Sequence, residues 1–228
     1  KKMEYHKPVL LKEVMENLKV EKGKKYIDAT LGDGGHTLEI LRKGGIVLGI
    51  EINEKALGRA VERIEKEGLS ENFKGVIGNF KNIEEIAKRE GFDGVSGIVY
   101  DLGYSSFELE KGGLGLSFLL DEPLDMRLDK NLGVTAADLL NSLSEKDIAN
   151  LIFKHSDERL AKRFAREIVK VRNLKKIQTT RNLVEIIESV SPPGYERGRI
   201  HPATRTFQAL RIVVNDEIES LEKSLPQA

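Results

Sequence analysis

The sequence predicts an α/β fold with a parallel sheet in its first half and a helical module after it. Short apolar runs alternate with helical patterns between residues 26 and 101, which is typical of parallel strands joined by helices. A glycine-rich turn follows the first apolar run, as in nucleotide-binding α/β proteins. Beyond residue 106 the pattern is helical, with no obvious strand.

The first predicted strand starts at Tyr26, and residues 32–37 (GDGGHT) form the glycine-rich turn that leads into a helix. Such a turn between a strand and a helix builds a nucleotide pocket. The second predicted strand covers residues 46–50 and is followed by Glu51. A carboxylate in this position can accept hydrogen bonds from ribose hydroxyls, so the first half of the chain is predicted to hold a nucleoside.

Two further strands are predicted at residues 73–77 and 97–101. Asn53 and Asn82 are expected to cap the helices that precede these strands. The fourth strand ends in Asp101.

The acidic candidates sit where the predicted strands end. Because ligands of open α/β sheets bind at the carboxyl ends of the strands, we expect Asp28, Glu51, Asp101 and the turn after Phe80 to converge on one crevice.

The second half is predicted to be a helical insertion. Ser144 begins a capping-box pattern, Thr180 is a candidate helix cap, and one long helix is expected to run from Pro202 past Leu221. That helix is expected to return to the sheet. The predicted division is therefore a sheet domain of residues 1–105 and 201–228, with residues 106–200 inserted.

The composition narrows the class of protein. The 228 residues are 39% hydrophobic, enough for one core and a smaller satellite domain, and 37 basic residues balance 37 acidic ones. Cysteine is absent, which excludes disulfides, thiolate zinc sites and cysteine nucleophiles. No apolar run approaches the roughly twenty residues that span a bilayer, and we expect a cytoplasmic protein. Because the chain begins with Lys1 and ends directly after a helical pattern, we expect it to be a fragment.

The turn favours a cationic cofactor without phosphate. A dinucleotide site has a third glycine and faces a pyrophosphate, whereas Asp33 stands in this turn and would repel phosphate. Asp28 and Asp33 instead suit a ligand with an ammonium and a sulfonium group, as in S-adenosylmethionine. A nicotinamide oxidoreductase and a purely structural tight turn are the alternatives.

Residues 101–104 (DLGY) stand where amino-directed methyltransferases carry Asp/Asn-Pro-Pro-Tyr, which they resemble in the first and last positions. An exocyclic amine on a base is a poor nucleophile, and a carboxylate that accepts one of its hydrogens orients the nitrogen. Asp101 is therefore the candidate catalytic residue. Tyr104 is a candidate for stacking on an extruded base, with a packing role as the alternative.

Four sequence blocks carry a resemblance to a known family: residues 6–11 (HKPVLL), 28–37, 101–106 with 122–127 (EPLDMR), and 201–211 (HPATRTFQALR). Together they resemble the bacterial small-subunit ribosomal RNA cytosine-N4 methyltransferases, the MraW or RsmH family. The resemblance implies a class I S-adenosylmethionine-dependent methyltransferase, with a Rossmann-like parallel sheet and an inserted helical domain for substrate recognition. It also implies methylation of the N4 amine of a cytidine in 16S ribosomal RNA.

The resemblance and the chemistry of the turn together give the predicted cofactor contacts: Asp28, Gly32, Gly34, Gly35, His36, Glu51, Phe80, Asp101 and Glu108. Glu108 replaces the usual glutamine of the family, and a carboxylate cannot donate as an amide does. Family members also continue into further strands with a Ser-Phe-His-Ser pattern, which this chain lacks. The sheet is therefore expected to be incomplete at its C-terminal end.

Basic residues concentrate in the helical module, where residues 154–181 carry ten Lys or Arg against three Asp or Glu. A segregated basic helix surface is what phosphate binding needs, and a solvated helix face is the alternative. The predicted substrate contacts are Arg127, Lys162, Arg163, Arg166, Arg199 and Arg205. Arg127 could instead anchor its loop by pairing with Asp125.

The expected partner is 16S ribosomal RNA in the small ribosomal subunit, without membrane contact and with a homodimer left open. No catalytic metal is expected, because the four histidines are scattered and no pair has helical metal-ligand spacing. A noncatalytic RNA-binding fragment and a methyltransferase that acts on another nucleic acid are the alternatives.

Overall fold

The computed structural model describes residues 8–103, 113–195 and 199–228. The chain divides into two compact units. Unit 1 comprises Lys1–Ser105 and Ile218–Ala228, and unit 2 comprises Ser106–Glu217. The predicted boundary at residue 201 differs from the observed one, because residues 201–217 belong to the helical unit, where their helix packs on other helices of that unit.

Unit 1 contains a parallel sheet of four strands in the order β3-β2-β1-β4. The strands are β1 (Lys25–Asp28), β2 (Ile46–Glu51), β3 (Phe73–Ile77) and β4 (Gly97–Val99). All four predicted strands are confirmed. Because β2 and β4 flank β1, the chain runs from β1 to β2 and β3 on one side and then crosses to β4 on the other side. Such a switch point is where α/β sheets bind ligands.

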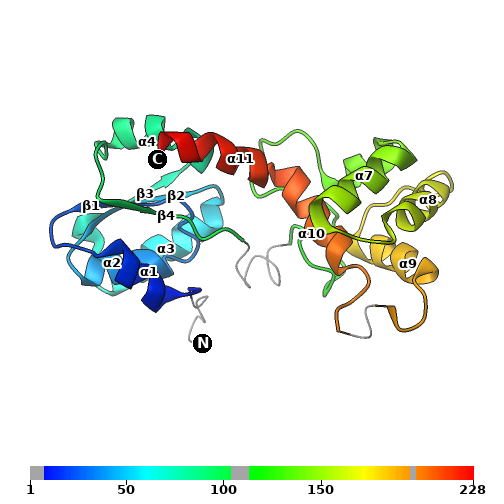
Figure 1. The fold of residues 1–228 in the computed structure, drawn as a ribbon, viewed down its shortest axis with the longest axis horizontal. Coiled ribbons are helices and arrows are strands. Elements are labelled where there is room, and N and C mark those ends of the chain that lie inside the picture. The colour runs from blue at the N-terminus through cyan, green and yellow to red at the C-terminus, as the bar shows by residue number, and fades with distance from the viewer. Residues whose placement is uncertain (1–7, 104–112, 196–198) are drawn as a thin grey trace. The chain divides into compact units, whose positions relative to one another are not determined.

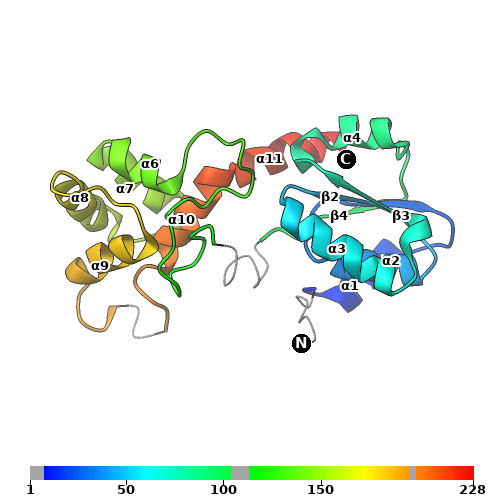
Figure 2. The ribbon, with the colours of Figure 1, turned by 180° about the vertical axis from the view of Figure 1, so that it is seen from behind.

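Helices cover both faces of this sheet (Figures 1 and 2). On one face lie α1 (Leu11–Leu18), α2 (Gly35–Arg42) and α3 (Glu54–Lys66), and on the other lies α4 (Ile83–Glu90) with α11 (Glu217–Ser224) beside it. Two short 3-10 turns, η1 (Ser70–Asn72) and η4 (Leu225–Gln227), complete the unit with a third before α4.

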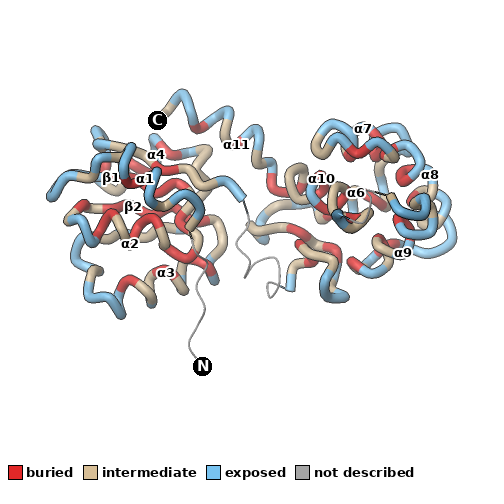
Figure 3. The backbone as a smooth tube through the Cα atoms, turned by 60° about the horizontal axis from the view of Figure 1, so that its bottom comes forward, coloured by how far each residue is buried: buried red, intermediate tan, exposed pale blue. Residues whose placement is uncertain are grey.

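The core of unit 1 follows the alternation of side chains along the strands. Tyr26 and Val47 pack into the cluster on the α2 side, whereas Ile27 and Leu48 pack into the cluster on the α4 side. The two central strands, β1 and β2, are therefore buried on both faces (red in Figure 3), as parallel strands usually are.

Asn53 caps α3 as predicted, because its side chain accepts a hydrogen bond from the backbone N–H of Lys55. The prediction for Asn82 is wrong: its side chain makes no capping bond. The chain instead enters α4 through the 3-10 turn η2 (Phe80–Asn82), which Asn79 caps by accepting from Lys81.

Unit 2 contains α6 (Ala136–Ser142), α7 (Glu145–Ser156), α8 (Ala161–Arg172), α9 (Thr180–Val190) and α10 (Thr204–Asn215). Its core includes Phe164, Ile168, Leu183, Ile187 and Phe207, all fully buried. These residues recur at helical spacing and turn to the inside, which agrees with the helical pattern of the second half. In the described part of the chain, no helix is long and apolar enough to cross a membrane.

In unit 2, one predicted helix cap is confirmed and another is wrong. Ser144 caps α7 by accepting from Asp147, as predicted. Thr179, not Thr180, caps α9, and it forms a capping box with Asn182. Thr180 is buried and its hydroxyl donates to the carbonyl of Leu120, so a tertiary contact displaces the cap by one residue.

The single long helix predicted from Pro202 onward is wrong. Asp216 adopts a left-handed conformation with φ 51°, so α10 ends at Asn215 and α11 begins at Glu217. The backbone N–H of Asp216 bonds to carbonyls of the last turn of α10, as in a left-handed helix end. The break coincides with the boundary between the two units.

A loop at residues 122–128 ties several parts of unit 2 together. Met126 donates its N–H to Leu114, and Asn215 bonds both Leu128 and Met126 from the end of α10. Gly115 lies against this loop with φ 66°, and an added Cβ would overlap the carbonyl oxygen of Pro123. Only glycine fits this position without a shift of the backbone.

Replacing Gly115 with alanine should therefore destabilise unit 2. Gly113 provides a matched control, because it has φ 67° but no atom within 4 Å of an added Cβ. We expect Gly113→Ala to lower the free energy of unfolding by about 1–2 kcal/mol through the left-handed backbone. Gly115→Ala should cost about 1–3 kcal/mol more through the steric overlap. Urea unfolding measures both, and equal losses would contradict the close approach.

Candidate active site

The predicted site residues of unit 1 meet where β1, β2 and β4 end. Asp28 is the last residue of β1, Glu51 is the last residue of β2, and Asp101 follows β4. Beyond the strands, the N–H of Ala29 donates to Val99 at 2.9 Å and the N–H of Asp101 donates to the Thr30 hydroxyl at 2.6 Å. These bonds hold the end of β1 against the end of β4.

Asp28 lies beneath this edge, with 1% of its surface exposed. One carboxylate oxygen accepts from the Thr37 hydroxyl at 2.7 Å, and the other accepts from the N–H of Thr30 at 3.2 Å. Burial raises the pKa of Asp28 above its ordinary value, although the hydrogen bond from Thr37 opposes this effect. Asp28 thus links the end of β1 to the start of α2, and its contact with a cofactor stays a prediction.

His36 lies between the N-terminal segment and Asp101. Its Nε2 is 3.1 Å from the carbonyl oxygen of Val9, and it must carry a hydrogen for this bond because a carbonyl only accepts. Its Nδ1 is 3.6 Å from Oδ2 of Asp101, which is too long for a hydrogen bond. His36 is buried, whereas 35% of the Asp101 side chain is exposed, so Asp101 is the carboxylate that a ligand can reach.

Glu51 connects the end of β2 to the glycine-rich turn. Its Oε2 accepts from the N–H of Gly32 at 2.8 Å, and its Oε1 accepts from the N–H of Asn53 at 2.9 Å. A carboxylate oxygen can accept more than one hydrogen bond. Glu51 can therefore hold the turn and still meet ribose hydroxyls.

The structure corrects the role given to Asp33. Its carboxylate is 2.8 Å from Nε of Arg59 on α3, and both side chains are largely buried. Its carbonyl oxygen accepts from Arg63 at 3.0 Å. The charge of Asp33 is thus neutralised within the protein, and the argument that it repels phosphate or attracts a cationic cofactor does not hold.

The remaining cofactor candidates surround the turn. Gly32 and Gly34 have positive φ values of 52° and 72°, which favour glycine, and Gly35 begins α2. Phe80 follows β3 and meets the Tyr100 ring edge-on at 5.8 Å between centroids. The site offers carboxylates that accept hydrogen bonds, main-chain N–H groups that donate them, and an aromatic ring. These groups suit the ribose, amino acid and adenine parts of S-adenosylmethionine, respectively, so the residues present fit this cofactor.

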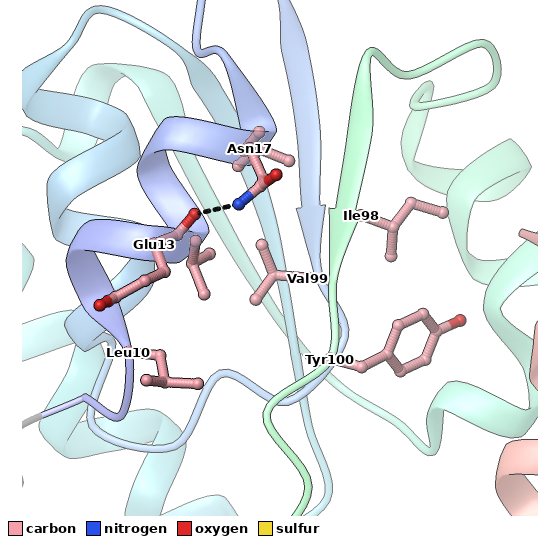
Figure 4. A pocket seen from close by; sticks show the side chains of 8 residues that line it. Leu10, Glu13, Asn17, Ile98, Val99 and Tyr100 are labelled. Carbon is pink, nitrogen blue, oxygen red and sulfur yellow. Dashed lines mark hydrogen bonds between the residues drawn. The ribbon is translucent and has the colours of Figure 1, made fainter.

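A separate groove of about 480 Å³ lies between α1 and β4 (Figure 4). Its lining is mostly apolar and consists of Leu10, Glu13, Val14, Asn17, Leu18, Ile98, Val99 and Tyr100. None of the predicted cofactor residues lines it. The groove is therefore distinct from the cluster at the strand ends.

The predicted substrate contacts of unit 2 are mostly exposed. Lys162, Arg163 and Arg166 lie exposed on α8, and Arg199 is exposed in the loop before α10. Arg205 is half-buried near the start of α10. The structure thus leaves most of these positions accessible to a polyanion.

Arg127 has the contacts of a loop anchor. It forms a bidentate pair with Asp125, at 2.6 Å and 2.9 Å, and donates to the carbonyl of Leu132 at 2.7 Å. This guanidinium lowers the pKa of the Asp125 carboxyl. The anchoring alternative is confirmed, and a contact of Arg127 with substrate stays a prediction.

Two predicted site residues, Tyr104 and Glu108, lie outside the described residues, as does the His6 block up to residue 7. In residues 8–103, 113–195 and 199–228, no group of three or more His, Cys, Asp or Glu side chains is placed to hold a metal ion.

The sequence analysis did not identify the residues whose hydrogen bonds hold Asp101, Asp28 and Asp33 in place. These are Thr30, Thr37, Arg59 and Arg63. The spacing of Arg59 and Arg63 places them on one face of α3, which was a usable signal. Their partner in the turn could not be inferred from that spacing.

The chain matches the model of the MraW methylase family over residues 3–228. Among curated relatives, the protein named ribosomal RNA small subunit methyltransferase H from Dictyoglomus turgidum is 44% identical over 226 residues, covering 97% of this chain and 75% of the relative. The protein of the same name from Geobacter sulfurreducens is 45% identical over 226 residues, covering 98% of this chain and 72% of the relative.

Burial of Asp28 should make stability depend on pH. A raised pKa in the folded state means that the contribution of Asp28 is complete below its unfolded pKa and is lost as the pH rises through the folded value. Asp28→Asn can keep the bond from the N–H of Thr30 at its oxygen, and its amide nitrogen can donate to the Thr37 hydroxyl, so both contacts persist without a charge. We expect the unfolding free energy of this variant, relative to the unmodified chain, to increase from about pH 4 upward.

Urea unfolding across this pH range measures the difference. Asp93→Asn is the control, because Asp93 is exposed, and its curve should run parallel to that of the unmodified chain. A parallel curve for Asp28→Asn as well would show that Asp28 is not destabilised by burial.

Proposed function

Because the chain belongs to the MraW methylase family, we propose that it transfers a methyl group from S-adenosylmethionine to the N4 amine of a cytidine in 16S ribosomal RNA. Its fold is that of the class I methyltransferases, with a parallel sheet and a helical unit inserted after β4. The exposed carboxylate of Asp101, beside the glycine-rich turn at the switch point of the sheet, is the observation that carries the proposal.

The name of the relatives supports ribosomal RNA of the small subunit as the substrate. The choice of an exocyclic amine rests on Asp101 and on the resemblance of residues 101–104 to the motif of amino-directed methyltransferases. A cytoplasmic location follows from the proposed substrate.

When bound, S-adenosylmethionine supplies an electrophilic methyl group. Glu51 would accept hydrogen bonds from the ribose hydroxyls, and the ring of Phe80 would lie against the adenine. After Gly34, whose own N–H donates to the carbonyl of Leu31, the main-chain N–H groups of Gly35 and His36 begin α2, where they would bind the carboxylate of the amino acid part.

Asp101 is the proposed catalytic residue. Its Oδ1 would accept a hydrogen of the amine, which aligns the nitrogen lone pair and stabilises the positive charge that develops on it. The backbone N–H of Asp101 is held by Thr30, and Oδ2 faces His36. The bond to Thr30 fixes the backbone of Asp101, so its carboxylate stays at the strand ends, where the amine would bind. The proton released after transfer would go to the same carboxylate.

The basic residues of α8 are proposed to bind phosphates of the RNA. Lys162, Arg163 and Arg166 are exposed, and Arg166 is only loosely paired with Glu145, at 3.8 Å. Arg172, in contrast, donates to the carbonyl of Leu140 and acts inside the unit. Arg199 and Arg205 are proposed as further RNA contacts, with Tyr104 on the extruded base and Glu108 near the cofactor.

The direct test supplies labelled S-adenosylmethionine and unmodified small ribosomal subunits, followed by digestion of the RNA and identification of the labelled nucleoside. The proposal expects N4-methylcytidine. A different labelled nucleoside would keep the methyltransferase but overturn the target. Binding of RNA without any transfer of label would favour the noncatalytic alternative.

Asp101→Asn should reduce kcat for methyl transfer by about 10²–10³-fold, because an amide carries no charge to stabilise the amine in the transition state. The affinity for RNA should not change, since Asp101 is not among the proposed phosphate contacts. Single-turnover transfer and RNA binding on the same samples separate the two effects. Retention of full activity would exclude Asp101 as the catalytic carboxylate.

Replacing Lys162, Arg163 and Arg166 together with glutamine should weaken RNA binding and reduce its salt dependence. Each phosphate contact on a single strand contributes about 0.7 to the slope of log affinity against log salt concentration, so the slope should fall by about 2. Lys43→Gln with Lys55→Gln is the control, since both lysines are exposed in unit 1. An unchanged slope in the α8 variant would make this surface an ordinary solvated helix face.

A further inference from the structure

The glycine-rich turn contains one ion pair that stands apart from the others in unit 1. Asp33 and Arg59, 2.8 Å apart, are 4% and 14% exposed, whereas Arg42 and Glu67, 2.9 Å apart, are 49% and 44% exposed. Exposed pairs contribute little because water screens them. Breaking a buried pair leaves an uncompensated charge, which is far more costly, so the Asp33–Arg59 pair constrains the turn.

The turn rests on one face of α3. Arg59 bonds the Asp33 carboxylate, and Arg63, one helical turn later, bonds the Asp33 carbonyl oxygen. Between them, Ala60 lies so close that an added Cβ on Gly34 would be 3.4 Å from its Cβ. Two hydrogen bonds therefore dock the turn on α3, with Ala60 beside Gly34.

Asp33 is also the single residue with a side chain among residues 32–35, which read GDGG. Glycine has many accessible backbone conformations, so the main-chain bond within the turn, from the N–H of Gly34 to the carbonyl of Leu31, still leaves it room to move. Gly32 is held from the opposite direction, because its N–H donates to Glu51 at the end of β2. The turn is thus clamped between β2 and α3. The contact with β2 uses the N–H of Gly32, and the contact with α3 uses the side chain of Asp33.

We propose that Asp33, held by Arg59 and Arg63, is a positioning residue for the cofactor site. It fixes the glycine-rich turn so that the N–H groups at the start of α2 are presented together with Glu51. It does not meet the positive charge of the cofactor. This inference rests on the proposed binding of S-adenosylmethionine.

Arg59→Met distinguishes positioning from direct contact, because the two roles predict opposite changes in the affinity for S-adenosylmethionine. If Asp33 positions the turn, loss of Arg59 releases the turn and weakens cofactor binding. If Asp33 meets the cofactor, loss of Arg59 removes the positive charge that pairs with its carboxylate and strengthens the binding of a cation.

Calorimetric titration with S-adenosylmethionine and with S-adenosylhomocysteine, which lacks the sulfonium charge, measures this effect. We expect Arg59→Met and Asp33→Asn each to raise both dissociation constants by about tenfold, corresponding to about 1.4 kcal/mol. The ratio of the two constants should stay unchanged. Arg42→Met, which breaks the exposed pair with Glu67, is the matched control and should bind as the unmodified chain does.

Tighter binding of S-adenosylmethionine to Arg59→Met would overturn the inference, as would a loss in Asp33→Asn that affects only the sulfonium ligand. If either single variant fails to fold, Arg59→Met with Asp33→Asn removes both buried charges together. This double variant should still bind both ligands more weakly. Binding equal to that of the unmodified chain would overturn the positioning role.

Hydrogen exchange without any cofactor gives an independent readout. The N–H groups of residues 32–36 should exchange faster in Arg59→Met than in Arg42→Met, because the turn opens more often. Equal exchange rates would overturn the clamp. If the unmodified chain bound neither ligand, the proposed function would fail, and the exchange rates would still decide whether Asp33 and Arg59 hold the turn.

Discussion

The parallel pairing of β1 with both β2 and β4 is the constraint on which the site depends. In this register Asp28 lies opposite Gly49 on one side and Val99 on the other. The carboxyl ends of the three strands therefore form one edge, and the residues that end or follow them lie close together. Because the chain crosses from one side of β1 to the other, no crossover helix blocks this edge, and such edges bind ligands in α/β proteins.

Short polar bonds then fix the edge at atomic scale. The Thr30 hydroxyl holds the backbone of Asp101, the Thr37 hydroxyl holds Asp28, and Glu51 holds Gly32. A site works when its groups are fixed before the ligand arrives, because reorganisation then costs little. The buried carboxylate of Asp28 holds Thr30 and Thr37 in place within the protein. The carboxylate of Asp101, in contrast, is partly exposed and can be reached by a ligand. The two aspartates thus differ in role because Asp28 is buried and Asp101 is not.

Local signals in the sequence predicted what depends on local structure. The four strands and the caps at Asn53 and Ser144 follow from periodicity and capping chemistry, which neighbouring residues determine. The shift of the α9 cap from Thr180 and the partner of Asp33 depend on residues distant in the chain. For Thr180, a hydrogen bond to Leu120 replaces the capping role. Tertiary contacts of this kind leave no periodic trace in the sequence.

Ligand binding at the strand ends can be tested by titrating the isotope-labelled chain with S-adenosylmethionine and following the backbone amide resonances. The account predicts that the largest shifts fall on residues 28–37, on Glu51 and on Asp101, at the ends of β1, β2 and β4. Shifts concentrated on the groove between α1 and β4, at residues such as Glu13 and Ile98, would contradict it. They would place the ligand away from the strand ends and from the carboxylate assigned to catalysis.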